Sequence, residues 1–245
     1  MSETKQKEEL LYLARLADQC DRFDEMVDYV CHFSKANDEE LTTDERNILS
    51  VAFKNVVGTR RAAWRVISLI ERKENKKGAV QNSEKAKNYK MKIEEELTSI
   101  CDRIIDLVAV DLLPKCKSDE GKVFLYKMLG DYYRYIAEYS SGENRNKAAT
   151  QAQNNYEEAK KLAADCLSST HPMRLGLALN YSVFFYEIKK KPKEACQMAR
   201  DAFDEAIADL DNVDDDFYKD ATLIMQLLRD NLTLWTEEVE GDGEA

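Results

Sequence analysis

A row of cationic side chains with helical spacing is the feature of this sequence that has the clearest chemistry. With ~100° per residue and Ile48 at zero, Lys54, Arg61 and Arg65 fall at about 240°, 220° and 260°. The apolar residues of the same segment fall between about 0° and 100°; they are Ala52, Val56, Ala63, Val66, Ile67 and Ile70. The basic stripe is therefore almost opposite an apolar stripe, and Arg60, near 120°, is expected to have another role.

The stripe has no acidic partner three or four residues away, so its charges are not arranged as surface ion pairs. A second cationic pair, Lys127 and Arg134, lies seven residues apart in KMLGDYYRY. Between them, Gly130 is expected to leave space for an anion and Asp131 to hold a guanidinium. Tyr135 adds a hydroxyl donor.

A phosphate group carries about −1.5 to −2 charges and three strong acceptor oxygens. Two guanidiniums, an ammonium and a phenol supply directed donors and a similar charge of opposite sign. We therefore predict that Lys54, Arg61, Arg134 and Tyr135 form a phosphate-binding cluster, provided that their two helices face each other across a cleft. A solvated cationic helix face is the alternative interpretation.

Helical periodicity extends along nearly the whole chain, which has only 8 Gly and 3 Pro and is predicted to be all-α. Thr42 and Glu45 form a candidate capping box. Asn82–Glu84 is a candidate helix start after a polar loop at 75–83, and Pro114 is a stop. Thr170-His171 is a candidate polar cap before Pro172. The predicted helices are 5–20, 23–36, 43–74, 83–112, 119–140, 144–167, 172–190, 192–210 and 216–236.

Two of the last helices have apolar faces that each carry one asparagine. In LALNYSVFFYEI the face holds Leu179, Asn180, Val183 and Glu187; in TLIMQLLRDNLTLW it holds Leu223, Leu227, Asn231 and Leu234, with Met225, Leu228 and Leu232 on the opposite side. An amide beside leucines suits an extended peptide, because it offers a donor and an acceptor to the peptide backbone. Two buried core faces are the alternative.

Composition excludes several classes of protein. The formal net charge of −11 disfavours nucleic-acid binding, although residues 51–73 form a basic island and residues 201–245 are acidic. The six cysteines show no CxxC spacing, so no metal or cofactor is predicted. His32 and His171 belong to no catalytic set, so no enzyme is predicted. The polar start MSETKQKEE and the absence of a long apolar run predict the cytoplasm, with the nucleus left open, and no membrane partner.

Four long segments closely resemble the 14-3-3 family: RNILSVAFKNVVGTRRAAWRVIS (46–68), KMLGDYYRYIAE (127–138), STHPMRLGLALNYSVFFYEI (169–188) and YKDATLIMQLLRDNLTLW (218–235). The resemblance implies a single domain of about nine antiparallel helices over residues 1–236, with an amphipathic groove, and a dimer. Residues 237–245 are predicted to be an acidic disordered tail.

The resemblance also implies roles for individual positions. Lys54, Arg61, Arg134 and Tyr135 match phosphate-binding positions, with Arg65 and Lys127 as further groove cations. The positions beside the ligand backbone are Asn180, Asn231, Glu187 and Trp235, and those of the hydrophobic wall are Leu179, Val183, Ile224, Leu227 and Leu234. The dimer positions are Leu16, Cys20, Arg22, Ala63, Ile67, Tyr89, Lys92 and Glu96.

The implied function is binding of client proteins at phosphoserine or phosphothreonine, as a homodimer or as a heterodimer with a related chain. Many members have Ser-Ser where this chain has Ala62-Ala63, and a phosphorylated serine there can loosen the dimer, so that control is unavailable here. A phosphate-independent, tetratricopeptide-like scaffold for acidic peptides is the alternative function, although no clean repeat of its length is present.

Overall fold

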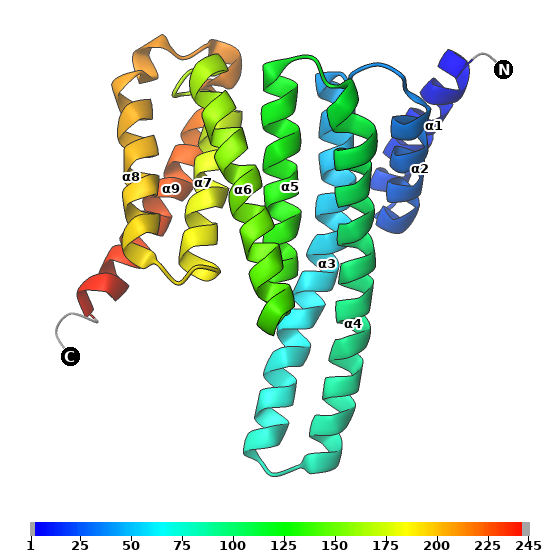
Figure 1. Ribbon diagram of the computed structural model, residues 1–245, viewed down its shortest axis with the longest axis vertical. Coiled ribbons are helices and arrows are strands. Elements are labelled where there is room, and N and C mark those ends of the chain that lie inside the picture. The colour runs from blue at the N-terminus through cyan, green and yellow to red at the C-terminus, as the bar shows by residue number, and fades with distance from the viewer. Residues whose placement is uncertain (1–2, 242–245) are drawn as a thin grey trace. The chain divides into compact units, whose positions relative to one another are not determined.

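The computed structural model describes residues 3–241, and within them the chain forms nine α-helices and no β-strand (Figure 1). The α-helices are α1 (Glu3–Gln19), α2 (Phe23–Ala36), α3 (Thr43–Lys76), α4 (Val80–Asp106), α5 (Asp119–Tyr139), α6 (Gly142–Cys166), α7 (Pro172–Glu187), α8 (Pro192–Ala208) and α9 (Asp215–Gly241). A π-helix, η1 (Leu107–Leu112), and a 3₁₀ turn, η2 (Leu113–Lys115), follow α4; a second 3₁₀ turn, η3 (Leu210–Asn212), precedes α9. The all-α prediction is confirmed.

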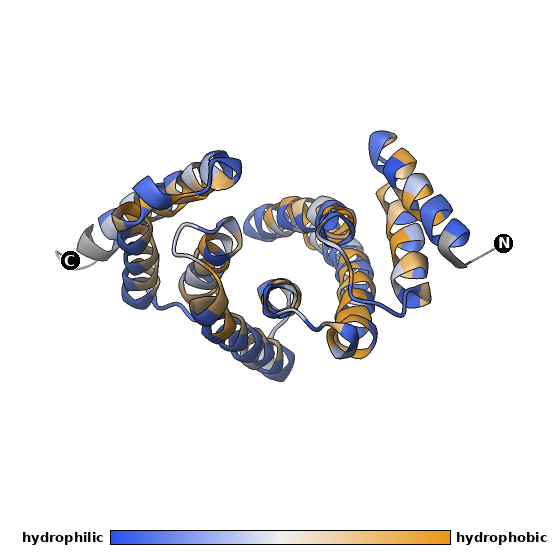
Figure 2. Ribbon diagram, turned by 90° about the horizontal axis from the view of Figure 1, so that it is seen from above, coloured by the Kyte–Doolittle hydropathy of each residue, from blue (hydrophilic) through white to orange (hydrophobic). Residues whose placement is uncertain are grey.

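The chain divides into two compact units, unit 1 (Met1–Cys116) and unit 2 (Lys117–Ala245). In unit 1, α3 and α4 form a long antiparallel hairpin (Figure 1). Fully buried Phe33, Leu49, Phe53, Leu97 and Ile104 fill its core. Figure 2 shows why these helices need partners: hydrophobic residues gather along one side of a helix and hydrophilic residues along the other.

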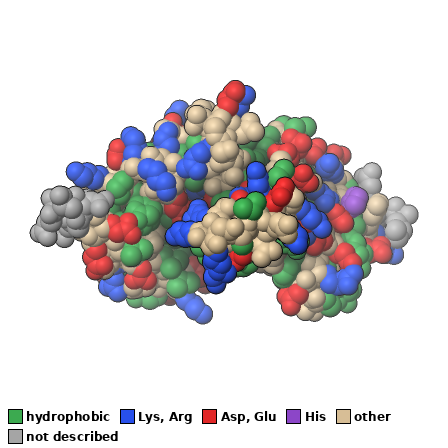
Figure 3. All heavy atoms as spheres, turned by 90° about the horizontal axis from the view of Figure 1, so that it is seen from below, with side chains coloured by type: hydrophobic (Ala, Val, Ile, Leu, Met, Phe, Trp, Pro, Cys, Tyr) green, Lys and Arg blue, Asp and Glu red, His purple; other side chains and the backbone are tan. Residues whose placement is uncertain are grey.

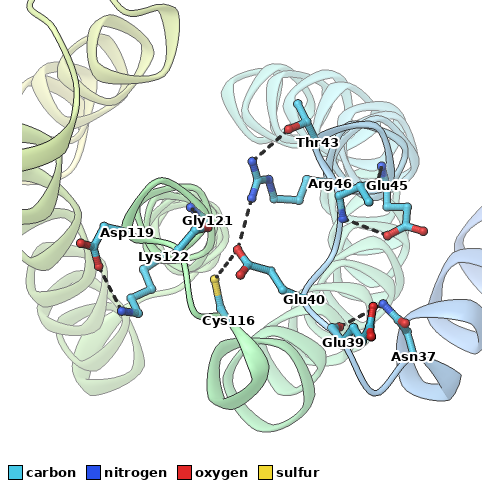
Figure 4. Close-up of polar contacts among 12 residues, drawn as sticks. Asn37, Glu39, Glu40, Thr43, Glu45, Arg46, Cys116, Asp119, Gly121 and Lys122 are labelled. Atoms are coloured by element: carbon cyan, nitrogen blue, oxygen red, sulfur yellow. Dashed lines mark hydrogen bonds and ion pairs between the residues drawn. The ribbon is translucent and has the colours of Figure 1, made fainter.

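The start of α3 has the predicted capping box. The Thr42 side chain accepts from the Glu45 amide at 3.3 Å, and the Glu45 carboxylate accepts from the Thr42 amide at 2.9 Å. Figure 4 shows a second set of contacts beside this cap: Arg46 donates to the Thr43 hydroxyl and pairs with Glu40, which also accepts from the Cys116 thiol at 3.3 Å. The segment before α3 is therefore tied to both the helix start and the end of unit 1.

The predicted start of the fourth helix is wrong by three residues, because α4 begins at Val80 and its N-cap, Ala79, makes no side-chain cap. The Ser83 hydroxyl instead donates to Asn75 Oδ1 at 2.6 Å, and Asn82 donates to Glu74 at 3.4 Å. These polar groups join α4 to the end of α3. The expected loop at 75–83 is only a turn at 77–79, where Gly78 has a φ of +70°.

In unit 2, α5 and α6 pack side by side along most of their length (Figure 1). The buried face of α6 is a stripe of small residues at helical spacing, Ala148, Ala152, Ala159 and Ala163, interrupted by one fully buried aromatic ring, Tyr156. Because alanine side chains are short, α5 can approach α6 closely along the stripe. The rings of Tyr181 and Phe184 from α7 complete this core.

The start of α7 and the end of α9 complete unit 2. The His171 Nδ1 accepts from the Met173 amide at 3.1 Å, so His171 caps α7 immediately before Pro172, as the sequence predicted. The predicted disordered tail begins at residue 237, but α9 continues to Gly241, because no glycine or proline interrupts it earlier. Residues 242–245 of that tail lie outside the described part of the chain. None of the described helices is long and apolar enough to span a membrane.

Candidate functional site

About two turns of α5 carry a buried group of charged side chains. Lys127, Asp131 and Arg134 are spaced at i, i+4 and i+7, which places them on one face of the helix. Asp131 and Arg134 are only 8% and 6% exposed, and Lys127 is partly buried. Charges withdrawn from water need partners, since desolvation of an unpaired ion costs several kcal/mol.

Asp131 is the centre of this group. Its carboxylate accepts from Lys127 Nζ at 2.9 Å, from the Tyr156 hydroxyl at 2.6 Å, and from Asn180 Nδ2 at 2.8 and 3.0 Å. Arg134 Nη2 lies 3.6 Å from Asp131 Oδ1. The sequence-based expectation that Asp131 holds a guanidinium is therefore confirmed, and groups from α5, α6 and α7 meet at one carboxylate.

Arg134 is held from three sides. Its Nε donates to the Tyr156 hydroxyl at 3.1 Å, its Nη2 pairs with Asp131, and its guanidinium carbon lies 4.7 Å from the centroid of the Tyr135 ring. The ring contact is a cation–π interaction, which favours the charged guanidinium. The side chain is thus fixed in one orientation before any ligand binds.

The same contacts set the ionisation of the group. Burial favours the neutral form of Asp131, yet Lys127, Arg134 and the hydrogen bonds hold its pKa below the ordinary value. Burial also disfavours the charged form of Arg134, but its neighbours, chiefly Tyr156, Tyr135 and Asp131, hold its pKa well above the ordinary value. Asp131 and Arg134 are therefore both charged, and with the Lys127 ammonium the three side chains sum to one positive charge.

Gly130 has a different role from the one expected from sequence. A Cβ at this position would lie 2.6 Å from Cδ1 and 2.7 Å from Cε1 of Tyr156, so the missing side chain makes room for a tyrosine ring and not for an anion. Sequence analysis did not select Tyr156. The only signal in the sequence is one aromatic residue within the alanine stripe of α6.

The candidate wall residues of α7 and α9 range from partly buried to exposed. Leu179, Val183 and Ile224 are partly buried against the core of unit 2, whereas Leu227 and Leu234 are exposed. Met225 and Leu228 are buried on the opposite side of α9, and Leu223 is exposed, as the face pattern predicted.

Trp235 and Asn180 have partners inside the chain. Trp235 is only 3% exposed and stacks on Tyr186 with ring centroids 4.7 Å apart, so its ring supports the wall from within. The Asn180 amide nitrogen donates to the Asp131 carboxylate. The side-chain oxygen of Asn180 takes no part in that contact. Asn231 and Glu187 are partly exposed.

The basic stripe of unit 1 lies on α3, where Lys54 and Arg65 are exposed and Arg61 is partly buried. Arg60 has the separate role that its angle on the helix predicted. It donates to Asp24 at 2.8 and 3.0 Å and to Glu96 at 3.4 Å, which ties α3 to α2 and α4.

Most of the predicted dimer residues are surface residues of unit 1. Leu16, Cys20, Ala63, Tyr89 and Lys92 are exposed, and Ile67 is partly exposed. The predicted pairing residues have partners within the chain: Arg22 bonds to Glu25, and Glu96 accepts from Arg60. On the face drawn in Figure 3, Lys and Arg side chains are interspersed with Asp and Glu.

These features are those of an all-helical protein in which one unit carries both an ordered group of charges on α5 and the partly apolar faces of α7 and α9. The described residues contain no group of three or more His, Cys, Asp or Glu that could hold a metal ion. A fixed guanidinium, an ammonium and adjacent amides can recognise an anion on an extended chain by hydrogen bonds alone.

Comparison with known proteins gives the family. The family model described as 14-3-3 protein matches residues 13–236. The chain is 52% identical over 240 residues to "14-3-3 protein 7" of Solanum lycopersicum, covering 98% of this chain and 95% of that protein. It is 54% identical over 235 residues to "14-3-3 protein I" of Plasmodium falciparum (94% and 90%) and 52% identical over 242 residues to the "14-3-3 protein homolog" of Neospora caninum (96% and 91%).

The chain therefore belongs to the 14-3-3 family. As a member of this family it is an adaptor and not an enzyme: it forms dimers and binds client proteins at phosphorylated serine or threonine. The tetratricopeptide-like alternative has no comparable support.

Proposed function

We propose that Lys54, Arg61, Arg134 and Tyr135 bind the phosphate of the client, with Arg65 and Lys127 as neighbouring cations. The observation that carries this assignment is the buried Arg134, whose orientation is set by Tyr156, Asp131 and the Tyr135 ring before a ligand arrives. A guanidinium that is already ordered loses little conformational entropy on binding, so more of its interaction with the phosphate contributes to affinity.

The client peptide lies extended beside the phosphate site. Asn180 and Asn231 hydrogen-bond to its backbone, and Glu187 and Trp235 lie next to these contacts, Trp235 as a buried support. The side chains that flank the phosphorylated residue contact a hydrophobic wall made of Leu179, Val183, Ile224, Leu227 and Leu234. The exposure of Leu227 and Leu234 supports this arrangement, because two large apolar side chains on a helix surface gain from being covered.

Two grooves on one dimer allow a doubly phosphorylated client to bind at both, which raises the effective concentration of the second site. We assign the dimer surface to Leu16, Cys20, Arg22, Ala63, Ile67, Tyr89, Lys92 and Glu96. Leu16 and Tyr89 are exposed apolar side chains that a second copy would cover, and a two-fold axis makes such a patch self-complementary.

The domain proposed for this function spans residues 1–236, with residues 237–245 as an acidic extension. The compartment proposed is the cytoplasm, with the nucleus as a second one. The partner chain of the dimer is a second copy or a related family member.

Calorimetric titration tests the site. An Arg- and Ser-rich peptide is titrated in two forms, with one central phosphoserine and without it. We expect tight binding of the phosphorylated form only, with about one peptide per protomer, because a neutral hydroxyl offers none of the charge that the cluster matches. Equal affinity for both forms would contradict the phosphate assignment and favour a phosphate-independent scaffold.

A further inference from the structure

Tyr156 of α6 is the buried group whose contacts bear most directly on the proposed phosphate site, although it lies outside that site. We propose that Tyr156 is a positioning residue that fixes the orientation of the Arg134 guanidinium and thereby sets the affinity for a phosphorylated ligand. The inference rests on the proposed role of Arg134 in phosphate binding.

The direction of the hydrogen bonds follows from the chemistry of the three groups. A guanidinium can only donate, an ionised carboxylate can only accept, and a phenol hydroxyl has one proton to donate. Arg134 Nε therefore donates to the Tyr156 oxygen at 3.1 Å, and the Tyr156 hydroxyl donates its proton to Asp131 Oδ1 at 2.6 Å. Tyr156 is the link that lets a carboxylate restrain a guanidinium through Nε.

This chain of contacts determines which edge of the guanidinium can meet a ligand. Nε of Arg134 donates to Tyr156, and Nη2 lies 3.6 Å from Asp131 Oδ1. The Nε–Nη2 edge of the guanidinium therefore contacts these two side chains. One face of the group is covered by the Tyr135 ring. The Nη1–Nη2 end is the edge that an approaching phosphate would meet.

The hydroxyl can act as a positioning group because its ring is packed on both sides. Tyr156 is fully buried, and its ring stacks on Tyr181 with centroids 5.0 Å apart. On the other side it approaches the backbone of α5 where Gly130 has no side chain. Gly130 directly precedes Asp131, so the ring is seated against the turn of α5 that carries the carboxylate.

The ionisation of Tyr156 agrees with this role. Burial and the neighbouring Asp131 carboxylate hold the pKa of the Tyr156 hydroxyl well above its ordinary value. The hydroxyl therefore remains a donor to Asp131 throughout the physiological pH range.

The test compares Tyr156→Phe with a matched control, Tyr181→Phe. Both changes remove one hydroxyl from adjacent stacked rings, but the Tyr181 hydroxyl donates to Glu157 at 3.2 Å and has no contact with Arg134. For Tyr156→Phe we expect the phosphoserine peptide to bind about five- to tenfold more weakly, because Arg134 loses the restraint on Nε and must then be ordered by the ligand itself. Tyr181→Phe should bind it as the wild type does, and the weak affinity for the unphosphorylated peptide should not change in either variant.

Several outcomes separate this inference from the proposed function. If the wild type fails to distinguish the two peptides, the phosphate site itself is wrong. If it distinguishes them and Tyr156→Phe binds as tightly as the wild type, only the positioning role is wrong. An equal loss in both tyrosine variants would indicate a general effect on packing and would also overturn the inference.

A measurement on the wild type keeps the inference testable even if Tyr156→Phe does not fold. The Nε–H resonance of Arg134, assigned by its loss in Arg134→Lys, should exchange with water far more slowly than that of a free arginine. It should remain protected when the phosphoserine peptide is added, because the ligand meets the other end of the group. Exchange at the rate of free arginine would show that the contact with Tyr156 does not persist and would overturn the inference.

Discussion

The two units of this 14-3-3 protein differ in the exposure of their candidate phosphate-binding cations. In unit 1, Lys54 and Arg65 are exposed on the surface of α3. In unit 2, Arg134 is buried on α5 and held by Asp131, Tyr156 and Tyr135. The exposure of a cation follows from the periodicity of its helix, whereas the orientation of the buried Arg134 depends on Asp131 and Tyr135 of its own helix and on Tyr156 of α6. Substitutions in the two units should therefore separate loss of affinity from loss of stability.

The largest expected effect comes from removing the carboxylate at the centre of the buried group. Asp131→Ala leaves Arg134 and Lys127 without their counter-charge, and we expect the free energy of unfolding to fall by about 3–5 kcal/mol. Chemical denaturation measures it.

The matched control for that variant lies on the same helix with the same i, i+3 spacing. Asp119 pairs with Lys122 at 3.1 Å, but both are substantially exposed. Asp119→Ala should cost less than about 1 kcal/mol, because solvent screens such pairs. Similar losses in the two variants would mean that the burial of Asp131 does not determine its contribution.

The opposite behaviour is expected on α3. Lys54→Glu should weaken binding of the phosphoserine peptide at least about a hundredfold, roughly 2.7 kcal/mol, because an attractive charge becomes a repulsive one. Since Lys54 is exposed, the fold and the dimer should be unchanged by circular dichroism and by sedimentation. Lys73→Glu makes the same change at another exposed position of α3 and should bind normally. Unchanged affinity in Lys54→Glu would remove Lys54 from the site.

Two glycines sharpen the comparison, because one substitution should have opposite signs in the two units. A Cβ at Gly130 of α5 would meet the Tyr156 ring at 2.6 Å, so Gly130→Ala should destabilise by about 1–3 kcal/mol. A Cβ at Gly58 of α3 would meet nothing within 4 Å, so Gly58→Ala should stabilise the helix by about 0.5–1 kcal/mol. Thermal melts of both variants test this, and a shared sign would contradict the difference in packing.

The same contrast explains what could be predicted from the sequence. Periodicity and caps predicted nine helices, with most ends within three residues; the ends of α4 and α9 differ more. They also separated Arg60 from the basic stripe, because helix ends and helix faces both depend on local spacing. The function of Gly130 and the importance of Tyr156 could not be predicted, because they depend on α6 meeting α5. The start of α4 was missed for a similar reason: Asn82 and Ser83 are typical capping residues, but their side chains bond to the preceding helix.

The smallest expected effect concerns the pH dependence of the α7 cap. Burial lowers the pKa of His171, and the nearby Glu120 carboxylate offsets part of this shift. The folded state therefore binds a proton at His171 less readily than the unfolded chain does. The contribution of His171 to stability is therefore fully present above about pH 6.5, the ordinary value for histidine, and is lost as the pH falls below it. Protonation also removes the Nδ1 acceptor used by the Met173 amide and places a positive charge at a helix N-terminus.

His171→Asn isolates this effect, because asparagine keeps a side-chain acceptor at the N-cap but does not titrate. We expect the difference in unfolding free energy between wild type and variant to be constant above about pH 6.5 and to shift against the wild type at lower pH. Denaturation titrations at a series of pH values measure this difference in unfolding free energy. The control is His32→Asn, a change at the exposed histidine of α2, measured over the same series. A difference that is independent of pH would mean that the His171 ring contributes through its contact with Phe217, 4.7 Å away, and not through its ionisation.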